Sequence, residues 1–156
     1  MNGTSANHKI VLALWLLSML LVIGAFAEQA SIPNSRLISP DELAKLLPSY
    51  KGERPLLIQV GFHVLYAQGH IPGSEYVGPA STEDGLLRLR KRVQALPRNT
   101  FILIYCGCCP WIHCPNIKPA DDALHALGFT NVKVLYLANN FASDWLDKGY
   151  PMAKGN

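Results

Sequence analysis

Hydrophobic residues in this chain gather in short continuous runs rather than at alternating positions. The three clearest runs are residues 55–60, 100–105 and 133–137. A run of this length without apolar–polar alternation predicts a strand that is buried on both faces. Strands of that kind belong to parallel sheets with helices on each side, so the pattern favours an α/β fold.

Between and after these runs the chain carries amphipathic stretches and residues typical of helix boundaries. Ser39 is the expected N-cap of a helix that begins at Pro40. Asn116 is a candidate cap for a later helix. Further helices are predicted over residues 86–96, 120–127 and 141–148. In such a fold a ligand is expected beyond the carboxyl ends of the strands, near a helix N-terminus.

The N-terminal 27 residues have the pattern of a secretory signal peptide. A polar start with one cation, Lys9, precedes an uncharged apolar stretch, residues 10–27, that ends in an Ala-Phe-Ala sequence. We expect cleavage at about Ala27 and a periplasmic or extracellular protein. The alternative is an uncleaved membrane anchor, because a single span needs about 20 apolar residues.

One domain is expected after this leader. Residues 28–36 are polar and predict a linker, whereas residues 37–153 predict the folded domain. Hydrophobic residues make up 49% of the 156 residues and charged residues 16%, a composition that argues against disorder. The net charge of +3 is too small to indicate a nucleic-acid partner, and no glycine-rich dinucleotide motif indicates an organic cofactor.

All four cysteines fall within nine residues, directly after the run at 100–105. They are Cys106, Cys108, Cys109 and Cys114. This segment joins the carboxyl end of a strand to a helix, where the fold class puts its ligands. A thiol beside a helix N-terminus is expected to favour the reactive thiolate. The segment is therefore the candidate site.

Several motifs in order along the chain resemble those of rhodanese domains. They are residues 69–73 (GHIPG), Tyr105-Cys106 at a strand end, residues 126–129 (ALGF) and residues 145–151 (WLDKGYP). The resemblance implies a parallel sheet of about five strands with helices on both faces. It also implies a sulfurtransferase that carries sulfane sulfur as a persulfide on Cys106, cradled by the backbone amides of the loop.

The chain departs from the family at the positions that usually bind an anionic donor. The family's Asp-x-Arg after the second strand corresponds to Gln59 and Gly61, and the arginine of its active loop corresponds to Trp111. Asn139-Asn140 replaces the family's Gly-Gly after the last strand. The remaining candidates for binding the substrate are Gly107, Trp111, His113 and Lys118.

Three interpretations of residues 106–114, called here the cysteine loop, remain open. In the first, Cys106 is the nucleophile, and Cys108, Cys109 or Cys114 resolves its persulfide as a disulfide. The donor is then thiosulfate or another small sulfur compound. The acceptor is a thiol or an exported redox protein.

In the second interpretation the four thiols and His113 bind a soft metal ion without sulfurtransferase turnover. Their spacing differs from the usual zinc pattern, so copper(I) or another thiophilic ion fits better. The third interpretation is a structural disulfide, Cys109–Cys114 or Cys106–Cys114. A single staple needs two cysteines, so four within nine residues favour chemistry.

Other conspicuous side chains are expected to be structural. His70 is expected to bond to backbone in a turn, and Trp145 and Tyr136 are expected in the core.

Overall fold

A computed structural model describes residues 31–49 and 54–155 of the chain. The expected signal peptide, residues 1–27, and the start of the expected linker lie outside the described residues. The elements below belong to the compact unit Ile32–Asn156. Within the described residues, no helix is both long and apolar enough to cross a membrane.

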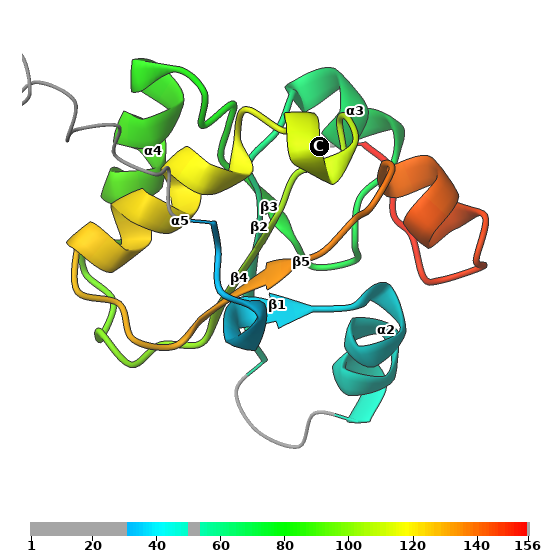
Figure 1. The fold of residues 1–156 in the computed structure, drawn as a ribbon, viewed down its shortest axis with the longest axis horizontal. Coiled ribbons are helices and arrows are strands. Elements are labelled where there is room, and N and C mark those ends of the chain that lie inside the picture. The colour runs from blue at the N-terminus through cyan, green and yellow to red at the C-terminus, as the bar shows by residue number, and fades with distance from the viewer. Residues whose placement is uncertain (1–30, 50–53, 156) are drawn as a thin grey trace, which may run out of the picture. The chain divides into compact units, whose positions relative to one another are not determined.

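Five parallel strands form one sheet (Figure 1). In chain order they are β1 (Leu37–Ile38), β2 (Leu56–Gln59), β3 (Glu75–Tyr76), β4 (Ile102–Tyr105) and β5 (Val132–Leu135). Their spatial order is β1-β5-β4-β2-β3. The sheet confirms the predicted parallel α/β class, and the three apolar runs supply its three longest strands.

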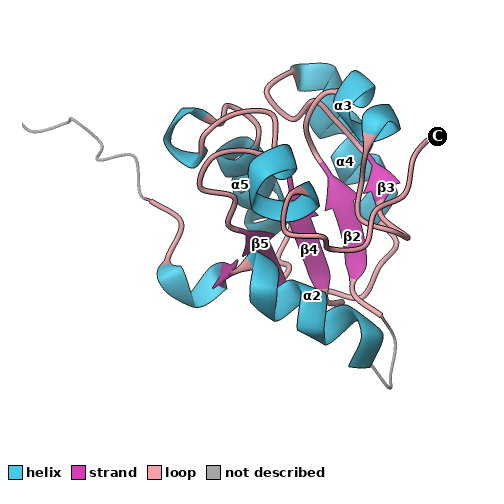
Figure 2. Cartoon of the chain, turned by 90° about the vertical axis from the view of Figure 1, so that its right-hand side faces the viewer, coloured by secondary structure: helices cyan, strands magenta, loops and turns pink. Residues whose placement is uncertain are grey.

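Helices cover both faces of the sheet, as the sequence predicts. One face packs on α4 (Glu83–Val93) and α5 (Ile117–Ala126), and the other packs on α2 (Pro40–Ser49) and the π-helical segment η3 (Ala142–Leu146). Figure 2 shows α2 in front of the strands, with α4 and α5 behind them. Successive residues of β4 alternate between the two hydrophobic clusters, which explains why this strand is apolar throughout.

The start of α2 follows the prediction. Ser39 Oγ accepts a hydrogen bond from the Glu42 N–H at 3.3 Å, and the Ser39 N–H donates to the Glu42 carboxylate at 2.8 Å. This reciprocal pair is a capping box, and Pro40 is the first helical residue.

Two helices begin three residues earlier than predicted, and the helix predicted over residues 141–148 is the shorter π-helical segment η3. The α4 helix begins at Glu83, three residues early, because the Thr82 side chain caps it by accepting from the Gly85 N–H at 3.1 Å. The α5 helix begins at Ile117 rather than at residue 120. Asn116 stands at its N-cap position but makes no side-chain cap bond, because its amide is used elsewhere.

Short elements escaped the sequence analysis because they have no periodicity. They are β1, β3 and the 3₁₀ turn η1 (Asn34–Arg36). The turn η1 lies within the expected linker and is tied to the domain, since Arg36 forms an ion pair with buried Asp121 at 3.1 Å. The helix α3 (His63–Gln68) follows β2.

The expectations for single structural side chains hold in two cases and fail in one. Trp145 is fully buried, and His70 Nδ1 lies 2.9 Å from the Tyr66 carbonyl oxygen. Tyr136 was expected in the core but is 39% exposed, because β5 ends one residue before it and its ring packs on the loop residue Trp111.

Candidate active site

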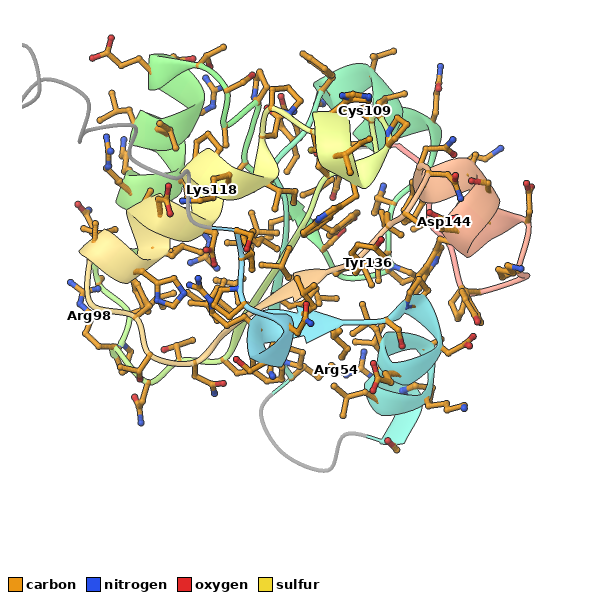
Figure 3. The ribbon with its side chains drawn as sticks, viewed as in Figure 1. Arg54, Arg98, Cys109, Lys118, Tyr136 and Asp144 are labelled. Atoms are coloured by element: carbon orange, nitrogen blue, oxygen red, sulfur yellow. The ribbon has the colours of Figure 1, made fainter. Side chains whose placement is uncertain are left out.

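The cysteine loop leaves the carboxyl end of β4 and enters α5. It carries the short 3₁₀ helix η2 (Trp111–His113) and is the yellow-green segment of Figure 1. Cys106, the first residue after β4, is only 3% exposed. Cys108, Cys109 and Cys114 are half-buried. All four are free thiols here. Figure 3 labels Cys109 in this loop.

The sulfur atoms of the loop are in mutual contact. Cys106 Sγ lies 3.2 Å from Cys108 Sγ, which in turn lies 3.0 Å from Cys109 Sγ. The sulfurs of Cys106, Cys108 and Cys114 all lie within 4.8 Å of one another. Cys109 also directs its thiol to the His113 carbonyl oxygen at 3.6 Å. The loop therefore holds a three-sulfur group with a fourth sulfur on its edge.

Asn116 holds two of these sulfurs and is a site residue that the sequence analysis missed. Its Nδ2 donates to Cys106 Sγ at 3.4 Å and to Cys108 Sγ at 3.7 Å. Its Oδ1 accepts from the Ser81 N–H at 2.9 Å, and the side chain is fully buried. An asparagine before a helix looks like a cap in sequence, so nothing in the pattern pointed to this role.

The thiols differ in acidity because they share hydrogen bonds. The pKa of Cys106 is raised well above its ordinary value, because its S–H donates to Cys108 and Cys114 and because it is buried. The pKa of Cys108 falls to about 5, chiefly because its sulfur accepts from Cys106. Negative charge therefore resides on Cys108 at neutral pH, while Cys106 keeps its proton in the resting protein.

The influence of the α5 N-terminus also falls on a different thiol from the one expected. The pKa of Cys114 is lowered to about 7, first by the hydrogen bond from Cys106 and then by the N–H groups of Asn116 and Ile117. These amides donate to Cys114 rather than to Cys106 because Cys114 lies just two residues before the α5 N-cap, Asn116.

Gln59 and Gly61 occupy the positions of the family's Asp-x-Arg and support the cysteine. Gln59 Nε2 donates to the Cys106 carbonyl oxygen at 3.2 Å, and its Oε1 accepts from the Gly61 N–H at 3.2 Å. A Cβ on Gly61 would lie 2.8 Å from Cys106 Sγ. The glycine is thus required by the close approach of the thiol.

A cavity of about 360 Å³ opens beside the loop. Cys106, Cys108 and Cys109 line one side of it, and Gln68 of α3 and Phe141 line others. Among the described residues, none of the side chains that line this cavity is a lysine or an arginine. The cavity therefore presents thiols, amides and apolar groups to a ligand.

Of the four expected substrate-binding residues, the structure brings only Gly107 to this cavity. The Trp111 ring packs on Tyr136, with centroids 5.0 Å apart, and the His113 side chain is exposed. The Lys118 ammonium is paired with the Asp122 carboxylate at 2.6 Å on the outer side of α5.

Most of the loop N–H groups that were expected to donate to the Cys106 sulfur donate to other acceptors. The N–H groups of Trp111, His113 and Cys114 donate to backbone carbonyl oxygens, which shape η2 and join the loop to Ala138. The Cys108 N–H does donate to Cys106 Sγ. Cys106 Sγ therefore accepts hydrogen bonds from the Cys108 N–H and from Asn116 Nδ2.

The Rhodanese-like domain family matches residues 39–138. The rhodanese-like domain of an Anabaena sp. protein is similar over 76% of this chain and 79% of its own, with 18% identity and a TM-score of 0.58. A single-domain sulfurtransferase from Saccharomyces cerevisiae is similar over 77% and 94%, with 17% identity and a TM-score of 0.54.

A thiosulfate sulfurtransferase from Pseudomonas aeruginosa gives 22% identity and a TM-score of 0.56 over 76% of this chain, but only 19% of its own length is covered. At these identities the likenesses show the fold. No curated protein sequence matches the chain significantly. The family match covers well over half of the chain. The chain belongs to the rhodanese-like domain family.

Proposed function

We propose that this protein is a sulfurtransferase that carries sulfane sulfur as a persulfide on Cys106. The observation that carries the proposal is the position of the Cys106 thiol. It follows β4 directly, lines the cavity, and accepts hydrogen bonds from the Cys108 N–H and from Asn116 Nδ2. Oriented donors of this kind stabilise the negative charge of a thiolate or a persulfide.

We infer that the donor is the persulfide of a small thiol, R–S–SH, rather than thiosulfate. Thiosulfate carries two negative charges, whereas the described lining of the cavity holds no basic side chain and Cys108 is itself anionic at neutral pH. Like charges brought together in a partly buried site repel each other. The sulfur group of a small-thiol persulfide carries at most one negative charge, so this repulsion is weaker.

Transfer then proceeds by thiol–disulfide chemistry. Cys106 passes its proton to the Cys108 thiolate, to which it is hydrogen-bonded, and the Cys106 thiolate attacks the outer sulfur of R–S–SH. The donor S–S bond breaks, and the leaving thiolate R–S⁻ takes up the proton from Cys108. The products are Cys106–S–SH and R–SH.

The thiol that resolves this persulfide is Cys108, because its sulfur is anionic and lies 3.2 Å from Cys106 Sγ. Its attack on Cys106 Sγ forms a Cys106–Cys108 disulfide and expels HS⁻. A dithiol redox protein of the same compartment reduces the disulfide and so regenerates the enzyme. With the signal peptide expected over residues 1–27, that compartment is the periplasm or the extracellular space.

The test is sulfide release by the reduced mature protein with either a small-thiol persulfide or thiosulfate as donor. We expect release with the persulfide and little with thiosulfate. Cys106→Ser should abolish the sulfur gain seen by intact mass, whereas Cys108→Ser should gain one sulfur and release sulfide slowly. Cys109→Ser, which keeps both Cys106 and Cys108, is the matched control and should still gain one sulfur and release sulfide. Full activity of the Cys106→Ser variant would contradict the proposal.

A further inference from the structure

The group formed by Cys106, Cys108 and Cys114 has the dimensions of a metal site. A thiolate–metal bond is about 2.3 Å long, so three sulfurs around a trigonal ion lie about 4.0 Å apart. The three Sγ atoms here lie within 4.8 Å of one another, with Cys106 and Cys108 at 3.2 Å. Opening that pair by about 0.8 Å and bringing the other two pairs to the same separation places all three sulfurs at bonding distance from one ion.

The number of ligands points to a particular ion. Cys109 Sγ touches Cys108 Sγ at 3.0 Å but is not one of the three sulfurs that all lie within 4.8 Å of one another, and its thiol also points to the His113 carbonyl oxygen. The His113 side chain is exposed on η2. Structural zinc sites take four ligands in a tetrahedron, one more than the three sulfurs that lie mutually close here. Three soft thiolates without a hard oxygen ligand favour copper(I).

The surroundings hold the three sulfurs in place before any ion binds. Asn116 Nδ2 contacts the sulfurs of Cys106 and Cys108, and its Oδ1 is fixed by the Ser81 N–H. The N–H groups of Asn116 and Ile117 donate to Cys114 sulfur. Hydrogen bonds to ligand atoms are a general means of orienting them and of raising metal affinity.

We propose that Cys106, Cys108 and Cys114 bind one copper(I) ion in a three-thiolate site. Binding displaces the protons held by the thiols and excludes most solvent, since Cys106 is nearly fully buried. Because Cys106 serves both copper and sulfane sulfur, the two occupy the site in turn. Copper(I) is then a competitive ligand of the proposed sulfurtransferase.

The experiment is an anaerobic titration of the reduced mature protein with copper(I) against a chromophoric copper(I) chelator. One ion per chain is expected. Cys114→Ser should weaken binding by more than the roughly 10–100-fold typical of losing an outer-shell partner, whereas Cys109→Ser should match the parent. Equal affinity of Cys114→Ser and the parent would overturn the site, as would an equal loss in Cys109→Ser.

Two further readouts separate this proposal from the others. Cys114 neither carries nor resolves the sulfane sulfur in the proposed transfer, so Cys114→Ser should lose tight copper binding and still form the persulfide. X-ray absorption of the copper-loaded unmodified protein needs no variant to fold. Three sulfur neighbours per copper are expected, and two or four would contradict the three-thiolate site.

Discussion

Replacing Gly61 by alanine tests whether the Cys106 thiol is held in its reactive position by close packing. The new Cβ would lie 2.8 Å from Cys106 Sγ and 3.0 Å from Gln59 Nε2. Non-bonded contacts of this type are comfortable at about 3.5–4.0 Å, so the sulfur must move by roughly 1 Å. Overpacking of this kind costs about 1–3 kcal/mol of unfolding free energy. A displacement of roughly 1 Å in a reacting atom is enough to slow a reaction about 100-fold.

The assay follows the gain of one sulfur by intact mass after mixing reduced Gly61→Ala with a small-thiol persulfide. Stability is measured in parallel by guanidinium unfolding. Gly69→Ala is the control, because Gly69 lines the same cavity and its new Cβ would meet its nearest neighbour, Leu146 Cδ1, at an ordinary 3.6 Å. A parental rate in Gly61→Ala would refute the packing argument, as would an equal loss of rate in Gly69→Ala.

Three further predictions follow from the same contacts. Cys106→Ala should raise the pKa of Cys108 by about one to two pH units, since a hydrogen bond to a charged group contributes about 1.5–3 kcal/mol. In the parent, the rate of Cys108 alkylation should fall only as the pH drops through about 5. In Cys106→Ala this rate should begin to fall at a higher pH. An unchanged dependence of the rate on pH would contradict the hydrogen bond between the two thiols. Tyr105→Phe should lower the unfolding free energy by about 1–3 kcal/mol, because the buried Ser74 hydroxyl loses its partner at 2.7 Å; unfolding at the parental denaturant midpoint would be the contrary result. Trp111→Arg should leave thiosulfate turnover unchanged, because this side chain lies outside the cavity lining, and a clear increase in turnover would show that it reaches the donor.

The strength of the sequence signal follows how each element is buried. The strand β4 lies between two other strands and both of its faces are covered. Its four consecutive apolar residues therefore predict it clearly. The two-residue strands β1 and β3 lie at the sheet edges and are only half-buried, which leaves no pattern to detect. The early start of α4 depends on one hydroxyl, that of Thr82, and such caps are visible only when the helix boundary is already known.

The sequence predicts where the candidate site lies but not which of its side chains are in contact. The spacing of the cysteines after a buried strand identifies the loop, because parallel strands end at the ligand-binding edge of the sheet. Which sulfurs touch depends on the path of the loop through η2, which no spacing rule gives. Asn116 contacts Cys106 across ten positions of chain, and only the folded loop brings them together.

The most direct test of the account is to locate the sulfane sulfur within the loop. Reduced Cys108→Ser, which lacks the proposed resolving thiol, is treated with a small-thiol persulfide, alkylated to trap persulfides, and digested for tandem mass spectrometry. The account predicts the added sulfur on Cys106. Sulfur found on Cys109 or Cys114 with none on Cys106 would contradict it, because the buried thiol at the end of β4 would then not be the sulfur carrier.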